Sequence, residues 1–454
     1  MIFTRTDLLL FLCFLLLAAL MAACLSLPHP VPGVSGIGYG AALTHFVMLA
    51  GVQGLIYAAA VALILWRRPS VATVWIVLGG ALVLRLIVLG APPFLSNDMY
   101  RYIWDGWVQG AGINPYRYIP ADAHLTFLRD EAVFPNINRA NYAHTIYPPA
   151  AQMVFATATC LAKLLRLPPV LAMKLAMVGL EGIGIWAMVR LLDAAGLPRA
   201  RVLVYAWNPL TVWEFASSGH VDAIVICFAP LALLAACHNR RGLSAAALAI
   251  AVLAKFFPLL WAPVLWQRWD CRFPAIFTGF IALLYLPYLG VGIGVFGFLG
   301  GYGNQEGIAD GKGLFFLSAL GHILPLPGFA SKLYLACLAA LLLVLGLRLQ
   351  NRVPTAQSLC RAALLLGGLG MAGLSPHYPW YYAWLLIPAC VAPRVSILYL
   401  ATASPLLYLN PIHTRLFWPA LLYVPFALLA GWDLWGAKLP FGPLHLKLTE
   451  GAKT

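Results

Sequence analysis

Long, unbroken runs of apolar residues recur from one end of this 454-residue chain to the other. Two examples are "LLLFLCFLLLAALMAACLSL", which begins at Leu8, and "LYLACLAALLLVLGL", which begins at Leu333. Runs near the threshold of about 18 residues indicate membrane-spanning helices, because a spanning segment must satisfy its backbone hydrogen bonds internally. The runs are continuous rather than alternating, which argues against a β-barrel. The sequence therefore predicts an all-α polytopic membrane protein.

The composition supports this class and excludes others. Only 10% of the residues are charged, against about 25% in a typical soluble domain. The net charge of +14 would suit a nucleic-acid-binding protein, but the basic residues stand as pairs between apolar runs. Such pairs set the topology of a membrane protein and attract anionic lipid, so we expect membrane lipids and no nucleic acid as partners. The nine cysteines form no CxxC motif, and no metal site is predicted.

The basic pairs also orient the chain when they are placed on the cytoplasmic side. About 12 crossings result, with both termini in the cytoplasm. The polar segment 92–146 then lies on the outer face as the first large loop. We expect the first apolar run to be retained as a helix, because its apolar core is long for a cleaved secretory signal. The whole chain, 1–454, is predicted to form one transmembrane domain without a separate soluble domain.

The apolar segment 243–266 is predicted to be a broken hairpin. The pair Arg240–Arg241 before it and Arg268 after it are placed on the same side of the membrane, although the segment is long enough to cross. It contains "LAKFFPLLWAP", whose prolines interrupt a helix, and Lys255 would otherwise lie deep in hydrocarbon. Two half-helices that meet near Lys255 fit better. The same reasoning predicts partial insertion of residues 147–169.

The outer loop opens with "SNDMYRYIWDGWVQG", which begins at Ser96. Read as a helix, this stretch places Asp98, Arg101, Tyr102 and Asp105 on one face. Five of the 15 acidic residues of the chain lie in the loop: Asp98, Asp105, Asp122, Asp130 and Glu131. A solvated amphipathic linker, in which Asp98 caps the helix or is neutralised by Arg101, would show the same spacing.

Five motifs carry a resemblance to a known family. They are "SNDMYRYIWDG" with "GINPYRY", "YPP" from Tyr147, "WNPLTVWEFASSGHVDAI" from Trp207, "LAKFFPLLWAP" from Leu253, and "SPHYPWYYAWLLIP" from Ser375. In this order, over roughly residues 80–390, they resemble the GT-C superfamily of membrane glycosyltransferases, which use polyprenol-phosphate sugars. The similarity is greatest to the bacterial GPI-mannosyltransferase-like group and to actinobacterial polyprenol-phosphate-mannose-dependent mannosyltransferases.

The resemblance implies both a fold and an activity. The fold is a GT-C-like bundle of about 12 transmembrane helices, with interfacial helices in the first outer loop. The activity is the inverting transfer of a hexose, mannose in this group, from a polyprenyl-phosphate donor to a lipid or glycan acceptor. The implied place is a bacterial inner (plasma) membrane, with the active site facing the periplasm or exterior. Many relatives carry paired acids where this chain has Asn97–Asp98, so no cofactor is expected and a divalent metal is not indicated.

The resemblance and the chemistry of the transfer assign roles to particular residues. Asp98 matches the loop carboxylate of the family and is the predicted general base. Cations are costly at membrane depth unless they face an anion, so Lys255 and Arg85, together with His377, are predicted to bind the donor phosphate. Snorkelling, or a pair with Glu181, is the alternative for the two cations. The predicted sugar- and acceptor-binding residues are Asp105, Arg101, Tyr102, His220, Asp222, Tyr378, Trp380 and Tyr381. Helix caps, structural histidines and an interfacial aromatic belt are the corresponding alternatives.

Other functions remain as rivals. A secondary transporter would also have broken helices and buried cations, but it should show two related halves, and none is found. A purely structural membrane protein would not need an acid cluster against buried cations. An O-antigen ligase or polymerase with a polyprenyl-pyrophosphate donor should carry its main Arg and His residues in a large late outer loop. In this chain the longest outer loop is the first.

Overall fold

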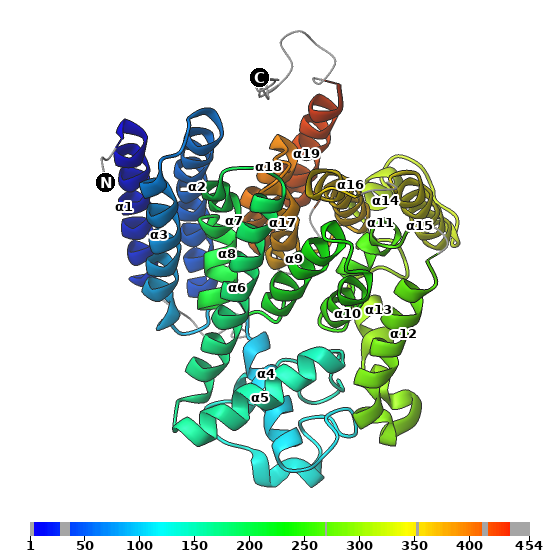
Figure 1. Ribbon diagram of the computed structural model, residues 1–454. Helices are drawn as coiled ribbons and strands as arrows, with labels where there is room; N and C mark the ends of the chain where they lie inside the picture. Colours follow the sequence, from blue (N-terminus) through cyan, green and yellow to red (C-terminus); the bar gives the residue numbers. More distant parts are fainter. Residues whose placement is uncertain (1–3, 28–36, 268–269, 351–353, 411–415, 436–454) are drawn as a thin grey trace.

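The computed structural model describes residues 4–27, 37–267, 270–350, 354–410 and 416–435, and every regular element in these ranges is helical (Figure 1). Within these ranges, eight helices are long and apolar enough to cross a membrane: α1 (Arg5–Leu25), α2 (Ile37–Trp66), α3 (Val71–Leu89), α6 (Pro169–Ala194), α12 (Arg272–Tyr285) with its 3-10 continuation to Phe296, α15 (Ala330–Arg348), α16 (Ala356–Leu374) and α19 (Phe417–Trp435). The prediction of an all-α polytopic membrane protein is therefore confirmed.

Shorter elements complete the bundle. Four are apolar helices of intermediate length: α5 (Pro149–Leu165), α9 (Ala223–Cys237), α10 (Arg241–Val252), and α18 (Val395–Ala403) with its continuation to Leu409. The remaining α-helices are α4 (Asp98–Gly110), α7 (Leu203–Ala206), α8 (Pro209–Thr211), α11 (Ala262–Leu265), α13 (Leu299–Gln305), α14 (Phe315–Gly321) and α17 (Leu386–Ala389). Among the described residues, the eight long helices are fewer than the expected 12 crossings, and two of the four shorter helices, α5 and α10, belong to segments that were not expected to cross.

Polar caps fix the starts of α1 and α3 next to each other. The hydroxyl of Thr4 accepts a hydrogen bond from the backbone N–H of Asp7 in α1, and Ser70 caps α3 in the same way. The Asp7 carboxylate also accepts hydrogen bonds from Ser70 Oγ at 2.9 Å and from Thr73 Oγ1 at 2.5 Å. Because both helices begin at the same end of the bundle, α2 must run in the opposite direction between them.

The predicted break in segment 243–266 is present. Helix α10 ends at Val252, and the chain continues through Lys255 into a 3-10 turn that begins at Phe257, before the one-turn helix α11. Arg241 Nη1 lies 3.3 Å from Asp270 Oδ2, so the two ends of the segment are adjacent and the chain returns to the side that it left. This is the geometry of a hairpin. Arg268, which was used to predict it, lies outside the described residues.

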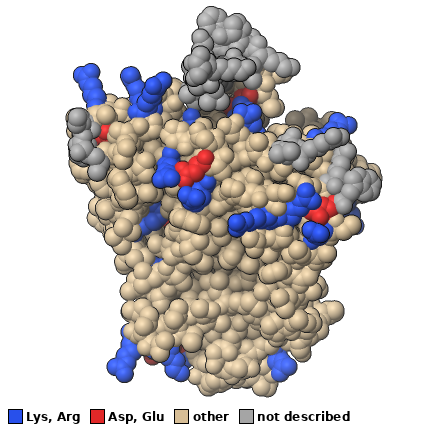
Figure 2. Space-filling view, in the orientation of Figure 1, with Lys and Arg blue, Asp and Glu red and all other residues tan. Residues whose placement is uncertain are grey.

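Helices α4 and α5 form a layer at the end of the molecule opposite the start of α1 (Figure 1). They approach closely at Gly106, where a Cβ atom would lie only 2.6 Å from the backbone oxygen of Phe155. In Figure 2, Lys and Arg gather toward the end where α1 begins, a band without charged side chains lies below them on this face, and a few basic side chains mark the α4–α5 end. This distribution suits a bundle that crosses a bilayer, with the α4–α5 layer at one surface.

Candidate active site

A cavity of about 370 Å³ lies between the start of α4 and the bundle. Its polar lining consists of Ser96, Asn97, Asp98, Asn138, Arg139 and Lys255; its aromatic lining of Tyr147, Tyr302, Tyr378, Trp380, Tyr381 and Tyr408; and its aliphatic lining of Leu43, Leu95, Ile146 and Leu407. The volume falls in the range of about 300–1,000 Å³ that is usual for small-molecule sites. Two cations and a carboxylate thus share one concave space with a wall of aromatic rings.

Asp98 is the first residue of α4, and its carboxylate is held from outside the helix. Asn138 Nδ2 donates to Asp98 Oδ1 at 2.6 Å and to Asn97 Oδ1 at 3.1 Å, which fixes the orientation of the carboxylate. Among the described residues, the other carboxylate oxygen, Oδ2, accepts no hydrogen bond. The N-cap position belongs to Asn97, and Arg101 pairs with Asp105. Asp98 is therefore neither the helix cap nor the partner of Arg101, which were the two alternatives to a functional role.

Lys255 reaches the cavity because the helix is broken there. Its Nζ lies 3.6 Å from Asp222 Oδ2 and 4.2 Å from the centre of the Tyr381 ring, an electrostatically favourable position for an ammonium group. The Lys255 side chain is 18% exposed, whereas that of Asp222 is 6% exposed. Burial raises the pKa of the Asp222 carboxyl, and the charge of Lys255 opposes that rise. Asp222 thus stands behind Lys255, and Lys255 faces the open space.

Arg139 supplies the second cation. Its backbone adopts φ = 56°, which is uncommon for a residue other than glycine. Its Nε donates to Gln305 Oε1 at 2.9 Å, and its guanidinium lies 5.6 Å from the centre of the Tyr302 ring. Burial alone would lower the pKa of the Arg139 guanidinium, but the nearby charge of Asp98 raises it above its usual value. Arg139 therefore remains a permanent positive charge near Asp98.

The aromatic wall is supported from behind by a buried polar group. The His220 ring stacks on Trp380 with their centres 4.0 Å apart, and His220 Nδ1 lies 3.0 Å from Glu214 Oε2. Glu214 belongs to a π-helical turn, Val212–Ser217, a type of distortion that is frequent at functional sites. Tyr408 donates from its hydroxyl to Glu214 Oε1 at 2.6 Å. The predicted sugar ligand His220 thus lies behind the wall and positions Trp380.

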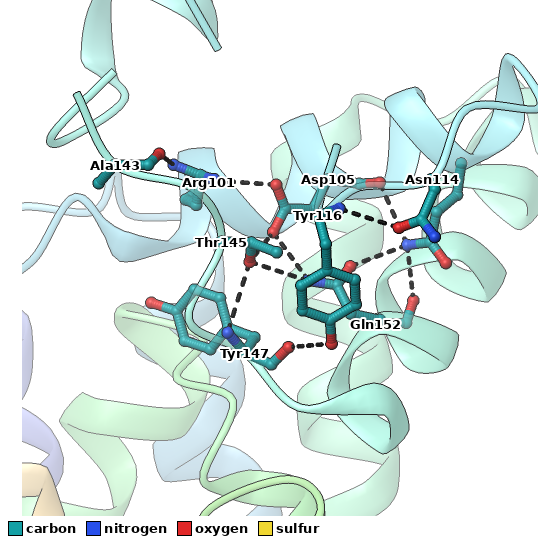
Figure 3. Close-up of polar contacts among 9 residues, drawn as sticks. Arg101, Asp105, Asn114, Tyr116, Ala143, Thr145, Tyr147 and Gln152 are labelled. Atoms are coloured by element: carbon teal, nitrogen blue, oxygen red, sulfur yellow. Dashed lines mark hydrogen bonds and ion pairs between the residues drawn. The ribbon is translucent and has the colours of Figure 1, made fainter. Parts of the chain in front are cut away.

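Asp105 and Arg101 were predicted to bind sugar or acceptor, but the structure places them in a buried network (Figure 3). Arg101 Nε donates to Asp105 Oδ1 at 2.9 Å, while Thr145 Oγ1 and Gln152 Nε2 donate to Asp105 Oδ2 at 2.5 and 2.9 Å. Arg101 also donates to the backbone oxygen of Ala143. These bonds join α4 to α5 and hold the end of the outer loop, so the network keeps the cavity wall in place without lining it.

Tyr102 also lies outside the cavity lining. Its ring stacks on Phe155 of α5, with the centres 4.6 Å apart, and meets the edge of the Tyr147 ring at 4.9 Å. Tyr147 itself lines the cavity, and its backbone oxygen accepts a hydrogen bond from the Tyr116 hydroxyl at 2.7 Å (Figure 3). Tyr102 therefore acts as packing behind Tyr147.

Two of the predicted phosphate ligands are engaged elsewhere. Arg85 donates from Nε and Nη2 to both carboxylate oxygens of Glu181, at 2.7 and 2.6 Å, and from Nη1 to the backbone oxygen of Ala206. It is 3% exposed and does not line the cavity. His377 Nδ1 lies 3.0 Å from Glu306 Oε2, which ties the segment before Tyr378 to the loop after α13. The pairing of Arg85 with Glu181 was the structural alternative, and the geometry favours it.

The sequence reasoning missed Asn138, Arg139 and Tyr302. Nothing local separates Arg139 from Arg117 and Arg129, the neighbouring arginines of the same loop. Asn138 and Arg139 reach the cavity from the outer loop and Tyr302 reaches it from α13, so all three depend on how distant parts of the chain fold together. Among the described residues, no group of three or more His, Cys, Asp or Glu side chains is arranged to hold a metal ion.

Comparison with models of protein families assigns residues 9–270, more than half of the chain, to the alpha-(1->6)-mannopyranosyltransferase family, N-terminal domain. The chain belongs to this family. It is a membrane glycosyltransferase of the mannosyltransferase type. Comparisons with curated proteins and with solved structures gave no match. The matched residues of this mannosyltransferase include Asp98, Asn138, Arg139 and Lys255, whereas Tyr302 and the Tyr378–Tyr381 wall lie beyond them.

Proposed function

We propose that this mannosyltransferase moves a mannosyl group from a polyprenyl-phosphate donor to a hydroxyl group of a lipid or glycan acceptor, with inversion at the anomeric carbon. The observation that carries the proposal is the cavity itself, in which Asp98 shares one space with Lys255 and Arg139. A transfer of this kind needs a proton acceptor on one side of the sugar and positive charge around the departing phosphate on the other.

In the proposed step, the acceptor oxygen attacks the anomeric carbon as the bond from that carbon to the phosphate oxygen breaks. The proton of the acceptor hydroxyl passes to Asp98 Oδ2, because Oδ1 already accepts from Asn138. The electron pair of the breaking bond remains on the polyprenyl phosphate, where Lys255 and Arg139 stabilise it. Inversion follows from attack on the face opposite the leaving group.

The aromatic lining suits a sugar substrate. Tyr378, Trp380 and Tyr381 line the cavity, and aromatic side chains provide surfaces on which the C–H faces of sugar rings pack. The hydroxyl groups of Tyr302 and Tyr381 lie 2.7 Å apart, which holds the Tyr381 ring beneath Lys255. We assign sugar or acceptor contact to these residues, and we assign positioning to Asp105, Arg101, Tyr102, His220 and Asp222. Arg85 and His377 are not retained as phosphate ligands.

The proposed site faces the outside of a bacterial plasma membrane. The α4–α5 layer that borders the cavity lies at the end opposite the start of α1, and most Lys and Arg visible in Figure 2 lie on the α1 side. Because basic residues favour the cytoplasmic side, the cavity belongs to the outer side. A lipid-linked donor would then enter along the membrane.

The test is a transfer assay with the purified protein in proteoliposomes. Radiolabelled polyprenyl-phosphate mannose, polyprenyl-phosphate glucose and a nucleotide-linked mannose are supplied in parallel with a membrane extract as acceptor. We expect label to move from polyprenyl-phosphate mannose alone, and to be lost with Asp98→Asn. Transfer from the nucleotide sugar without a lipid intermediate would overturn the donor assignment, and preference for glucose would overturn the sugar.

A further inference from the structure

A second cavity, of about 440 Å³, lies at the opposite end of the molecule from the candidate active site. It is formed where the end of α15, the first turns of α16, the start of α18 and the last turns of α19 come together. Its lining is Arg348, Leu349, Ser358, Arg361, Ala362, Leu364, Leu365, Gly368, Leu369, Arg394, Ser396, Ile397, Phe426, Ala430, Asp433 and Leu434. The space therefore combines a polar mouth with a long apolar wall.

Three arginines stand at this mouth without a charged partner. Among the residues that the structure describes, no carboxylate lies within ion-pair distance of Arg348, Arg361 or Arg394. Elsewhere in the bundle an arginine such as Arg85 has a carboxylate of its own. All three residues are exposed at the surface. Three positive charges that line one cavity attract an anion, and the described part of the chain places no free carboxylate beside them.

The one acidic residue of the cavity does not supply this anion. Asp433 Oδ2 accepts hydrogen bonds from the backbone N–H and the hydroxyl of Ser396, at 3.0 and 2.6 Å. Its carboxylate thus caps the start of α18. Arg394 reaches only the backbone oxygen of Asp433, at 3.4 Å. The mouth carries three positive charges against one negative charge that is already hydrogen-bonded.

The apolar wall identifies what kind of anion fits. From Ser358 to Leu369, α16 lines the cavity over eleven residue steps, or about 16 Å at a rise of 1.5 Å per residue. This is about half of the ~30 Å hydrocarbon thickness of a bilayer, which is the depth of one leaflet. Leucine and phenylalanine side chains of α16 and α19, such as Leu365 and Phe426, border this length. A free phosphate ion would leave the wall unused, whereas an acyl chain would cover it.

We propose that this cavity is a binding site for an anionic glycerophospholipid of the leaflet opposite the candidate active site. The lipid phosphate lies among Arg348, Arg361 and Arg394, and one acyl chain lies along α16 and α19. The C-terminal segment of the chain itself is a poor occupant, since residues 436–454 contain three lysines and one acid and would repel the arginines.

Native mass spectrometry of the full-length protein in detergent tests the site, with titrations of phosphatidylglycerol and phosphatidylcholine that carry the same acyl chains. The test variant is Arg348→Gln/Arg361→Gln/Arg394→Gln. The matched control is Arg5→Gln/Arg67→Gln/Arg68→Gln, which removes the same charge from exposed positions outside the cavity. A groove-filling variant, Ala430→Trp, keeps all three arginines but occupies the acyl-chain space.

We expect phosphatidylglycerol to bind more tightly than phosphatidylcholine to the natural protein and to the control. Each lost arginine should weaken phosphatidylglycerol binding about fivefold, and the three together about a hundredfold. Ala430→Trp should also weaken it. Unchanged binding in the arginine variant, an equal loss in the control, or equal affinity for phosphatidylcholine would each overturn the proposal. If inorganic phosphate displaces the lipid, and the Ala430→Trp protein binds inorganic phosphate as the natural protein does, the site takes phosphate and not lipid. If the triple variant does not fold, the test uses Arg361→Gln alone, which should weaken phosphatidylglycerol binding about fivefold.

Discussion

Replacement of Asp98 by Asn removes the proposed proton acceptor with little change in shape. The new side chain keeps the oxygen that accepts from Asn138 at 2.6 Å, and it replaces only the second carboxylate oxygen by an NH₂ group. The backbone bond from Asp98 to Ser96 Oγ does not depend on the side chain and should persist. The variant therefore isolates proton transfer from folding and from the architecture of the cavity.

The expected loss follows from the role of a general base. Positioned acid–base groups contribute about 10² to 10⁴ in rate, so kcat of Asp98→Asn should fall by that factor, which is about 2.7 to 5.5 kcal/mol in the barrier. KM for the donor should change by less than about threefold, because Lys255 and Arg139 remain. Asn138→Ala removes the hydrogen bonds to Asp98 Oδ1 and Asn97 Oδ1 but leaves the carboxylate in place. A hydrogen bond to a charged group is worth about 1.5–3 kcal/mol, so kcat should fall about tenfold to a hundredfold.

Asp105→Asn is the matched control on the same face of α4. Asp105 is 1% exposed and bonded to Arg101, Thr145 and Gln152, so the loss of its charge should act on stability, by about 3–5 kcal/mol, rather than on chemistry. Both variants are compared by steady-state transfer from polyprenyl-phosphate mannose and by thermal unfolding in detergent. Near-native turnover of a folded Asp98→Asn protein would refute the assignment. A catalytic loss confined to a fully stable Asp105→Asn protein would exchange the two roles.

Three further outcomes test the remaining assignments. Lys255→Met should raise KM for the lipid donor at least about tenfold in a correctly inserted protein, with partial recovery in Lys255→Arg, and an unchanged KM would return Lys255 to a purely structural role. Arg85→Met should destabilise the protein by about 3–5 kcal/mol because it leaves Glu181 buried and unpaired, whereas Arg85→Met/Glu181→Leu should regain most of that loss in thermal unfolding. The hairpin is tested with an impermeant thiol reagent added outside cells, in a protein that lacks the other exposed cysteines. The reagent should label a Thr126→Cys control but not the native Cys271, which follows the hairpin. Labelling of Cys271 from outside would contradict the hairpin.

The fold is largely readable from the sequence because its main determinants are local. An apolar run of sufficient length must form a helix in lipid, and the eight long helices correspond to such runs. The break at Lys255 was also predictable, since a lysine followed by prolines in an apolar segment marks an interruption wherever the segment folds. The shorter apolar helices are harder to anticipate, because their ends depend on what they pack against.

The candidate site was predictable only in part. The spacing of Asp98, Arg101 and Asp105 on one helical face is the same for a catalytic acid and for a structural one. What separates them is the partner of each carboxylate: Thr145 and Gln152 enclose Asp105, whereas Asn138 leaves one oxygen of Asp98 free among the described residues. These partners lie about 40 residues away along the chain, and no local sequence pattern indicates that they contact α4.

The movement of charge during the proposed step explains why the cavity holds a carboxylate at the start of α4 and a cation elsewhere. Before transfer, the donor phosphodiester and Asp98 each carry one negative charge; afterwards Asp98 is neutral and the released polyprenyl phosphate carries close to two. The total charge in the cavity is therefore almost unchanged, but negative charge moves from the start of α4 toward the phosphate. A cation beside the phosphate stabilises the product side of this displacement more than the substrate side, which lowers the barrier in addition to binding the donor. Lys255, held on a broken helix with Asp222 behind it, is a cation whose position does not depend on α4, so it can favour that movement of charge without neutralising Asp98.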